Sequence, residues 1–341
     1  MYEFTNLLHN CMTTRNESVL RDTKGVVEEY IARAQMKEEH DLYIEYKYIN
    51  DYRRFYKKRA YSGEVYYFGF EDLLYYSVKY LERLTTDEEL LFDYIIIDEY
   101  QDISEIKYKL TYKTAKRNNA KVYAVGDDWQ SIYSFSGAKV EYFYRFNKFF
   151  KGAKNFKITK TYRNSQELID SAGEFIKKNP MQIDKTLVSE KHLYRPIKFR
   201  TFSSKDDEGD EVPNSEIECL KRTIREIHRA NPEDNILILG RNNEMIDAIL
   251  KNNSFVDCVG SKIQLKSNTN INIDGMTIHK SKGLTCDEVI IIGLNKRFPS
   301  DNQSKFWIES LFKSSVEKEQ IPYAEERRIF YVGLTRTRNR V

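Results

Sequence analysis

An apolar run that ends in two carboxylates constrains this chain more than any other feature of its sequence. Residues 92–102 read Phe-Asp-Tyr-Ile-Ile-Ile-Asp-Glu-Tyr-Gln-Asp, so the apolar stretch stops abruptly at Asp98 and Glu99. A second apolar run, at residues 121–125, is also followed by polar residues and a helical pattern. Short apolar strands that alternate with helices predict a parallel sheet with covering helices. Carboxylates at the carboxyl end of such a strand lie where open α/β sheets bind ligands, although a strand that ends in solvated acids has the same pattern.

The same alternation returns in the second half of the chain. Apolar runs at residues 197–202, 236–239, 276–278 and 289–292 predict a second set of strands. Residues 203–213 are acidic and poor in apolar side chains, which predicts an exposed loop, and a helix with an apolar face follows from Ser215. A length of 341 residues favours two domains, since a typical domain has roughly 100 to 200.

The first 90 residues have helical rather than strand-like patterns. An apolar stripe within residues 70–81 predicts one amphipathic helix there. Residues 52–59 interleave basic and aromatic side chains, as a surface that binds single-stranded nucleic acid does. A solvated helix face backed by buried rings gives the same pattern, so both interpretations stay open.

Composition excludes several classes of protein. The chain is 40% hydrophobic and 31% charged, which excludes collagen-like and wholly disordered chains. Its net charge of +3 is too small to indicate a nucleic-acid or membrane partner by itself. The four cysteines form no CxxC pair and the five histidines no HExxH pair, so neither zinc nor a disulfide framework is expected. No apolar run approaches the roughly 18 residues that span a bilayer, so we expect a soluble, cytoplasmic protein without a membrane partner.

Five segments together resemble the helicase motifs of the UvrD/Rep group of superfamily one. Residues 97–102 and 124–138 resemble its second and third motifs, and residues 160–164, 276–284 and 325–336 its fourth, fifth and sixth. All five occur in the family's order, and the resemblance extends from about Gly69 to the end of the sequence. The Gly-Asp-Asp-Trp-Gln form of the third motif is most similar to the bacterial helicase IV branch.

This resemblance implies an ATP-dependent DNA helicase and gives roles to three residues of the first domain. By position, Asp98 corresponds to the Mg²⁺ ligand and Glu99 to the catalytic base of the family. Gln130 corresponds to the residue that senses the γ-phosphate and the attacking water. The implied cofactors are therefore ATP and Mg²⁺.

Further nucleotide contacts are implied in the second domain. Tyr162 corresponds to the residue that stacks on adenine, and Lys282 and Gly283 lie near the phosphate path. Arg163 and Arg336 correspond to a pair of arginine fingers that reach the γ-phosphate. A planar, permanently charged guanidinium suits the charge that phosphoryl oxygens share.

Four residues match positions that contact DNA in the family. Tyr133 and Phe135 correspond to aromatic residues that stack on bases of single-stranded DNA, although both could instead be core residues. Thr277 and His279 correspond to DNA-backbone and interdomain contacts. The expected partners are therefore single-stranded DNA and duplex junctions, with 3′ to 5′ movement implied by kinship alone.

The resemblance implies an α/β fold class with two RecA-like domains of the P-loop NTPase type. We expect a helical subdomain at residues 1–90, an incomplete first RecA-like domain at 91–158 and a second one at 159–341. The family's phosphate-binding loop, G-x-x-x-x-G-K-[ST], has no counterpart, since the sequence contains no Gly-Lys dipeptide.

The chain therefore looks truncated at its N-terminus relative to the family, and we expect it to be inactive alone. A missing N-terminal segment or a partner chain would have to supply the loop, and an apolar strand edge would lie open without it. Two alternatives remain: a catalytically silent module that binds DNA or protein, and a fragment of a longer protein.

Overall fold

The structure is a computed structural model that describes residues 70–84, 92–203, 215–258, 260–294 and 321–341. Within it the chain forms two compact units, of which the first ends at Ala153 and the second begins at Lys154. The basic and aromatic segment at residues 52–59 lies outside the described residues, as do most of the expected N-terminal helices and the loop at 204–213.

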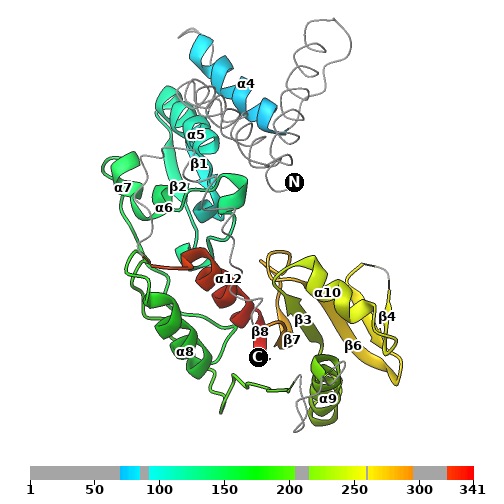
Figure 1. Ribbon diagram of the computed structural model, residues 1–341. Helices are drawn as coiled ribbons and strands as arrows, with labels where there is room; N and C mark the ends of the chain where they lie inside the picture. Colours follow the sequence, from blue (N-terminus) through cyan, green and yellow to red (C-terminus); the bar gives the residue numbers. More distant parts are fainter. Residues whose placement is uncertain (1–69, 85–91, 204–214, 259, 295–320) are drawn as a thin grey trace, which may run out of the picture. The chain divides into compact units, whose positions relative to one another are not determined.

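Unit 1 contains a parallel pair of strands with helices and short 3-10 turns around it (Figure 1). Strands β1 and β2 pair in parallel, with Ile97 opposite Ala124 at their carboxyl ends. The expected helix within residues 70–81 and both expected strands are confirmed. The elements in chain order are α4 (Phe70–Arg83), β1 (Tyr94–Ile97), η1 (Tyr100–Asp102), α5 (Glu105–Asn118), β2 (Lys121–Ala124), η2 (Asp128–Gln130), η3 (Ser134–Ser136), α6 (Glu141–Tyr144) and α7 (Phe146–Phe149).

Aromatic rings pack beneath the loop that follows β1. Tyr100 is buried, and its ring lies edge-on to Phe146 with the centroids 5.2 Å apart. The rings of Tyr108 and Tyr142 stack at 4.6 Å. Aromatic pairs in such arrangements add about 0.5–1.5 kcal/mol each beyond area burial. This cluster therefore holds the loop after β1 against α5, α6 and α7.

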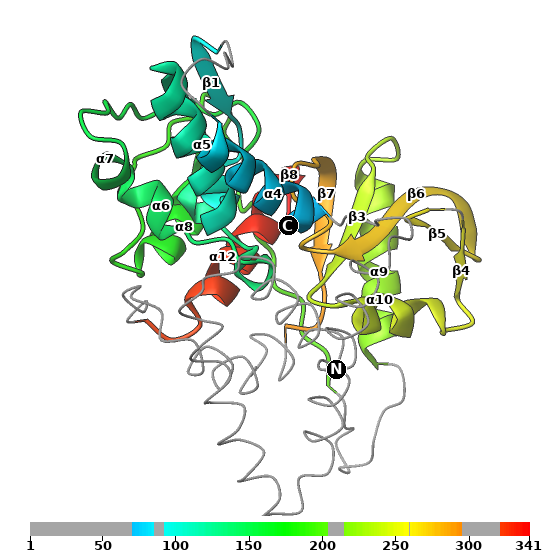
Figure 2. The same cartoon turned by 90° about the horizontal axis from the view of Figure 1, so that it is seen from above.

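Unit 2 is built on a six-stranded sheet of order β4-β5-β6-β3-β7-β8 (Figures 1 and 2). Strands β6, β3, β7 and β8 are parallel, whereas β4, β5 and β6 form an antiparallel edge. The elements are α8 (Gln166–Lys177), α9 (Ser215–Ala230), β3 (Ile236–Gly240), α10 (Asn243–Leu250), β4 (Phe255–Asp257), β5 (Lys262–Leu265), β6 (Asn268–Thr277), β7 (Cys286–Ile291), α12 (Ala324–Leu334) and β8 (Thr337–Arg340).

The structure contains some of the strands expected in unit 2 but not all of them. Those at 236–239 and 289–292 are confirmed, and the run at 276–278 is the end of the longer strand β6. Residues 197–202 form no strand, so that expectation was wrong. In the described structure one backbone hydrogen bond connects this stretch to another segment, from the Lys198 amide to the Val341 carbonyl at 2.8 Å.

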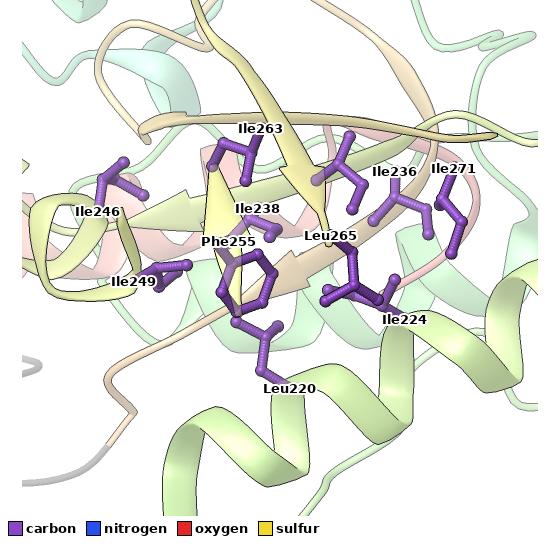
Figure 3. Packing of buried hydrophobic residues seen from close by; sticks show 11 residues of the cluster. Leu220, Ile224, Ile236, Ile238, Ile246, Ile249, Phe255, Ile263, Leu265 and Ile271 are labelled. Atoms are coloured by element: carbon purple, nitrogen blue, oxygen red, sulfur yellow. The ribbon is translucent and has the colours of Figure 1, made fainter. Parts of the chain in front are cut away.

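The core of unit 2 lies between the sheet and helices α9 and α10. Alternate residues of the fully buried strand β3, Ile236 and Ile238, face this layer, where they pack with Leu220 and Ile224 of α9 and with α10 (Figure 3). Helix α12 covers β7 instead, and its Gly333 approaches the Ile291 side chain so closely that an added Cβ would lie 3.1 Å from it. The parallel strands are therefore covered on both faces, as their continuous apolar sequences predict.

Glu288 makes the stability of this unit depend on pH. It is 3% exposed in β7, and burial raises its pKa from the ordinary 4.5 to about 7, although Arg340 lies 3.8 Å away and opposes the shift. Between these two values the unfolded state has already released the proton that the folded state retains, so stability falls as pH rises from 4.5 to 7. The loss can reach about 3 kcal/mol.

We expect Glu288→Gln to remove this part of the pH dependence in urea denaturation followed by circular dichroism at pH 5 and pH 7.5. An unchanged pH dependence would contradict the assignment.

Candidate functional site

The carboxyl ends of β1 and β2 bring two polar loops together in unit 1. Asp98 and Glu99 follow β1 directly, and both are exposed. Glu99 has left-handed backbone angles, φ 52° and ψ 41°, which a non-glycine residue adopts only when its surroundings impose them. The chain thereby turns at once, so that the Tyr100 amide donates to the Val125 carbonyl beyond β2 at 2.9 Å.

A buried glutamine ties these two loops to each other. Gln101 is 0% exposed, and its amide nitrogen Nε2 donates to the Glu99 carboxylate. Its Oε1 accepts from the backbone amide of Asp127, in the loop after β2, at 2.9 Å. One side chain therefore orients the Glu99 carboxylate with respect to the neighbouring loop.

The chain of hydrogen bonds continues to Gln130. Asp127 begins the 3-10 turn η2, where its Oδ1 accepts from the Trp129 amide at 3.1 Å. Its Oδ2 accepts from Gln130 Nε2 at 2.7 Å. We call Glu99, Gln101, Asp127 and Gln130 the relay, because hydrogen bonds connect each to the next. The relay holds a carboxylate and an amide in fixed positions at the edge where a ligand of a parallel sheet binds.

Gly126 is required by this close approach. A Cβ at this position would lie 2.4 Å from Gln101 Oε1 and 3.1 Å from the Tyr100 amide nitrogen. We expect Gly126→Ala to separate the loops and to lower the unfolding free energy by about 1–3 kcal/mol, measured by denaturant titration. Gly152→Ala is a control for the loss of glycine, although its φ of +81° adds backbone strain without any close contact. Faster amide exchange at residues 99–102 in the Gly126 variant alone would identify loop separation as the cause, and equal exchange in both would contradict it.

Tyr133 lies near the relay. Its side chain is half-buried, and burial, followed by the negative charges of Asp102 and Glu99, raises its pKa. The ring therefore stands beside the acidic loop rather than freely in solvent. The structure gives no description of the Phe135 side chain, so its expected contact with DNA bases stays a prediction.

In unit 2, Tyr162 is the most open of the expected nucleotide contacts. It is 79% exposed, and the Lys160 ammonium lies 5.2 Å from the centroid of its ring. An exposed ring presents a face on which a base can stack. The adjacent Arg163 is partly buried.

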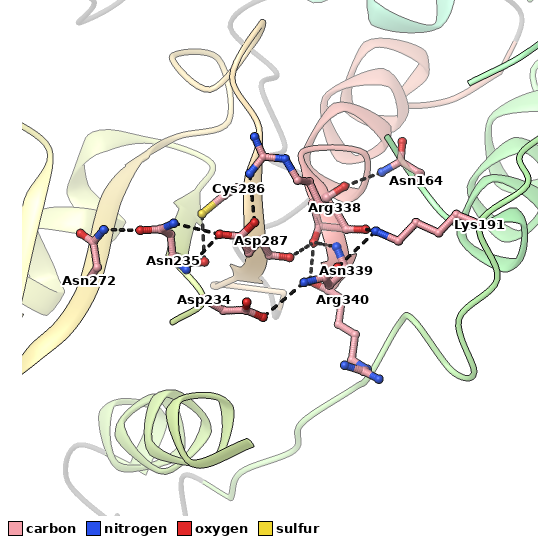
Figure 4. A network of polar contacts seen from close by, with 11 residues as sticks. Asn164, Lys191, Asp234, Asn235, Asn272, Cys286, Asp287, Arg338, Asn339 and Arg340 are labelled. Atoms are coloured by element: carbon pink, nitrogen blue, oxygen red, sulfur yellow. Dashed lines mark hydrogen bonds and ion pairs between the residues drawn. The ribbon is translucent and has the colours of Figure 1, made fainter. Parts of the chain in front are cut away.

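Asn164 connects the Arg163 loop to the segment around Arg336. It is 5% exposed, and its Nδ2 donates to the carbonyl of Thr337 at 2.6 Å and to that of Thr335 at 3.5 Å. Its own carbonyl accepts from the Ser189 hydroxyl at 2.8 Å. Figure 4 shows Asn164 and Lys191 directed toward the start of β8, in a network that extends to Asp287 and Asp234. The Asn164 side chain thus connects the backbone next to Arg163 to the backbone on both sides of Arg336, which lies 173 positions further along the chain.

The expected role of Arg336 requires an exposed guanidinium, but the structure buries this side chain. It is 1% exposed, and its Nε donates to the Val332 carbonyl at 2.9 Å. Its two terminal nitrogens lie 3.3 Å from the Thr335 hydroxyl and 3.5 Å from the Leu284 carbonyl. Arg336 therefore joins the end of α12 to the loop after β6, so that its removal disturbs the fold as well as any ligand contact.

The loop after β6 carries the remaining expected contacts. Thr277 is 7% exposed, and its hydroxyl accepts from the Lys280 amide at 3.3 Å, which stabilises the turn. His279 and Lys282 are partly exposed on this turn. Gly283 has φ +84°, and no atom lies within 4 Å of the position that a Cβ would take, so the backbone there is open to a ligand.

Two family models match separate regions of the chain. Residues 4–151 match the UvrD/REP helicase N-terminal domain, and residues 258–341 match the UvrD-like helicase C-terminal domain. The chain belongs to the UvrD/Rep helicase family. Its fold class is therefore confirmed as α/β with RecA-like domains.

Several curated helicases are similar to this UvrD/Rep family member. DNA helicase IV of Escherichia coli is 34% identical over 253 residues, which are 73% of this chain and 33% of the relative. DNA helicase II of Haemophilus influenzae is 34% identical over 35% of this chain and 16% of the relative. ATP-dependent DNA helicase Rep of Escherichia coli is 32% identical over 35% of this chain and 18% of the relative. The matched region spans about a third of helicase IV and less of the others.

The residues that connect the family motifs were missed by sequence reasoning. Gln101 lies within the quoted second motif and Asn164 follows Arg163 directly, so motif position was a signal for both. Arg241 had no motif, although it follows β3 at the ligand-binding edge of the sheet. Its guanidinium Nε lies 3.0 and 2.9 Å from the two carboxylate oxygens of Glu326 in α12, and both side chains are largely buried.

Asp98 is compatible with the Mg²⁺ that the family uses. Among the described residues no group of three or more His, Cys, Asp or Glu side chains could hold a metal ion alone. Mg²⁺ bound with a nucleotide needs only one or two protein carboxylates, since phosphates and water complete its coordination. The exposed Asp98 carboxylate, oriented by the Glu99 amide on its Oδ1 at 2.9 Å, fits that requirement. In the described part of the chain, no helix is long and apolar enough to cross a membrane.

Proposed function

We propose that this chain forms part of an ATP-dependent DNA helicase that moves 3′ to 5′ on single-stranded DNA. The relay is the observation that carries the proposal. It joins Glu99, the proposed catalytic base, to Gln130, the proposed sensor of the γ-phosphate. A base and a polar amide held together can position an attacking water and respond to the phosphate it attacks.

This arrangement supports the roles that we propose within unit 1. Glu99 accepts the proton of the attacking water, and Gln130 orients that water against the γ-phosphate. Asp98 would hold Mg²⁺, which when bound neutralises charge on the phosphate oxygens. Gln101 and Asp127 keep the base and the sensor in register.

Unit 2 supplies the remaining nucleotide contacts in this proposal. Tyr162 stacks on adenine, and Lys282 and Gly283 line the phosphate path. Arg163 and Arg336 donate to the γ-phosphate, where guanidinium groups stabilise the charge of the transition state. The exposed ring of Tyr162 and the Asn164 contacts that fix both arginine segments support these roles.

DNA contacts are proposed at four residues. Tyr133 and Phe135 stack on bases, while Thr277 and His279 contact the DNA backbone or the other domain. Stacking on aromatic rings accepts any base sequence, as movement along a strand requires. Repeated closing and opening of the two proposed domains around ATP would then move the protein along single-stranded DNA toward a duplex junction.

The proposed domains are a helical subdomain at 1–90 and RecA-like domains at 91–158 and 159–341. Because the sequence contains no Gly-Lys dipeptide, we propose that these 341 residues alone do not turn over ATP. In this proposal, a further segment or a partner chain supplies the phosphate-binding loop that ATP hydrolysis requires.

Complementation tests this function. We expect the purified chain to show no ATPase activity, and to gain DNA-stimulated activity when a recombinant segment bearing the loop is added. Glu99→Gln should then lower the rate by about 10²–10⁴-fold, because the carboxamide cannot accept the proton. Steady-state phosphate release with and without single-stranded DNA is the measurement.

Matched variants separate the possible outcomes. Glu190→Gln changes an exposed glutamate of unit 2 whose ion pair is with Lys160, and should leave the rate near that of the parent chain. Activity of the chain alone would contradict the requirement for the loop. No activity after complementation, with DNA binding retained, would favour a catalytically silent DNA- or protein-binding module.

A further inference from the structure

A buried serine holds the backbone directly after Arg163. Ser189 is 5% exposed, and its hydroxyl donates to the Asn164 carbonyl at 2.8 Å. The same hydroxyl accepts from the Lys191 amide at 3.1 Å, and the Ser189 amide donates to Oε1 of Gln166 at 2.8 Å. Because the hydroxyl both donates and accepts, a methyl group in its place would lose both of its contacts.

The residue before Ser189 holds the other side of the same loop. The Val188 amide donates to the Thr159 carbonyl at 2.8 Å, and the Val188 carbonyl accepts from the Thr161 amide at 2.9 Å. Together with the Ser189 contacts, these bonds fix the backbone on both sides of Arg163.

A closed ring of hydrogen bonds joins this loop to β8. Asn164 Nδ2 donates to the Thr337 carbonyl at 2.6 Å, at the start of the strand. The carbonyl of the next residue, Arg338, accepts from Lys191 Nζ at 2.5 Å (Figure 4). The Lys191 amide then donates to the Ser189 hydroxyl, which donates to Asn164 and closes the ring. The ring therefore fixes the loop with respect to the start of β8.

The two proposed arginine fingers depend on this ring to different degrees. Arg336 is 1% exposed, and its own guanidinium donates to the Val332 and Leu284 carbonyls. The Arg163 guanidinium, by contrast, makes no hydrogen bond or ion pair with any residue that the structure describes. The position of Arg163 is therefore set by its backbone, which the ring holds.

We propose that Ser189 is a positioning residue of the ATPase site, which acts through Asn164 to place the Arg163 guanidinium with respect to Arg336. This inference rests on the proposed function, in which both arginines donate to the γ-phosphate. A displacement of about 1 Å at a catalytic group can lower a rate by about 10²-fold, because the reaction depends on geometry. The exposed Glu190 carboxylate, which pairs with Lys160, takes no part in the ring.

The complemented chain tests this role by kinetics. Ser189→Ala should lower kcat for phosphate release about 10–100-fold and change the KM for ATP less than about threefold, because the base still stacks on Tyr162. Ser189→Thr keeps a hydroxyl and should restore kcat to within about threefold of the parent chain. As a matched control, Ser261→Ala removes a hydroxyl that donates to Asp274 at 2.7 Å, at the antiparallel edge of the sheet, and should change neither constant.

A double-mutant cycle separates positioning from a general loss of structure. In an Arg163→Ala background no guanidinium remains to be placed, so Ser189→Ala should lower the single-turnover rate less than about twofold further. An equal fold loss in both backgrounds would overturn the proposal, because Ser189 would then act on the fold as a whole. A kcat for Ser189→Ala within about twofold of the parent chain would also overturn it. If Ser189→Ala does not fold, Ser189→Cys, which has a similar size and a weaker donor, takes its place in the cycle.

Hydrogen exchange gives a second readout that needs no turnover. The Thr161 and Gln166 amides donate to carbonyls on either side of Ser189. A peptide that covers residues 159–167 should therefore exchange several-fold faster in Ser189→Ala than in the parent chain or in Ser261→Ala. Unchanged exchange would overturn the proposal. Inactivity of the complemented parent chain would instead contradict the proposed function, and with it any role of Ser189 in the reaction.

Discussion

Replacing Arg163 by Ala is expected to lower the ATPase rate of the complemented chain by about 10³–10⁵-fold. The guanidinium would no longer stabilise the charge that develops on the γ-phosphate. Arg163 is partly exposed, so the midpoint of urea denaturation should change little. The measurement is kcat for phosphate release beside the denaturation midpoint of the same protein.

Two further variants make this expectation specific. Arg229→Ala removes an exposed arginine at the end of α9 and should alter neither the rate nor the midpoint. Arg336→Ala should lower both, because that guanidinium is buried against the Val332 and Leu284 carbonyls. A rate for Arg163→Ala within twofold of the parent chain would exclude Arg163 from the transition state.

Replacing Arg241 by Ala is expected to destabilise unit 2 by about 3–5 kcal/mol, because it leaves the Glu326 carboxylate buried without its partner. Both side chains are largely buried, at 15% and 12% exposure, and the guanidinium contacts both carboxylate oxygens. The pair joins the end of β3 to the first turn of α12. Denaturant titration followed by circular dichroism measures the loss.

A double variant separates the buried charge from simple loss of packing. Arg241→Met with Glu326→Leu replaces the pair by apolar side chains of similar size, and should recover most of the lost stability. If the double variant is as unstable as Arg241→Ala, packing at this position rather than the unpaired carboxylate limits stability. If Arg241→Ala itself costs less than about 1 kcal/mol, the pair behaves as an exposed ion pair does.

The sequence alone determined where the principal strands lie and which family the chain belongs to. The apolar run that stops at Asp98 was expected as a strand, and its last four residues form β1 (Tyr94–Ile97). The motifs are contiguous stretches, and apolar periodicity is a local property, so neither depends on knowing which distant residues meet. The family models then matched residues 4–151 and 258–341, which confirmed the resemblance.

Tertiary structure alone decided which side chains hold the site together. Gln101 bonds to a loop 26 positions away and Asn164 to a carbonyl 173 positions away, and no local pattern specifies such partners. Arg336 corresponds in sequence to an arginine finger, yet in the fold its guanidinium donates to the Val332 and Leu284 carbonyls. The apolar run at 197–202 shows the same physical limit. A strand exists only where another backbone supplies hydrogen bonds, and among residues 197–202 the described structure gives one such bond, from the Lys198 amide to the Val341 carbonyl.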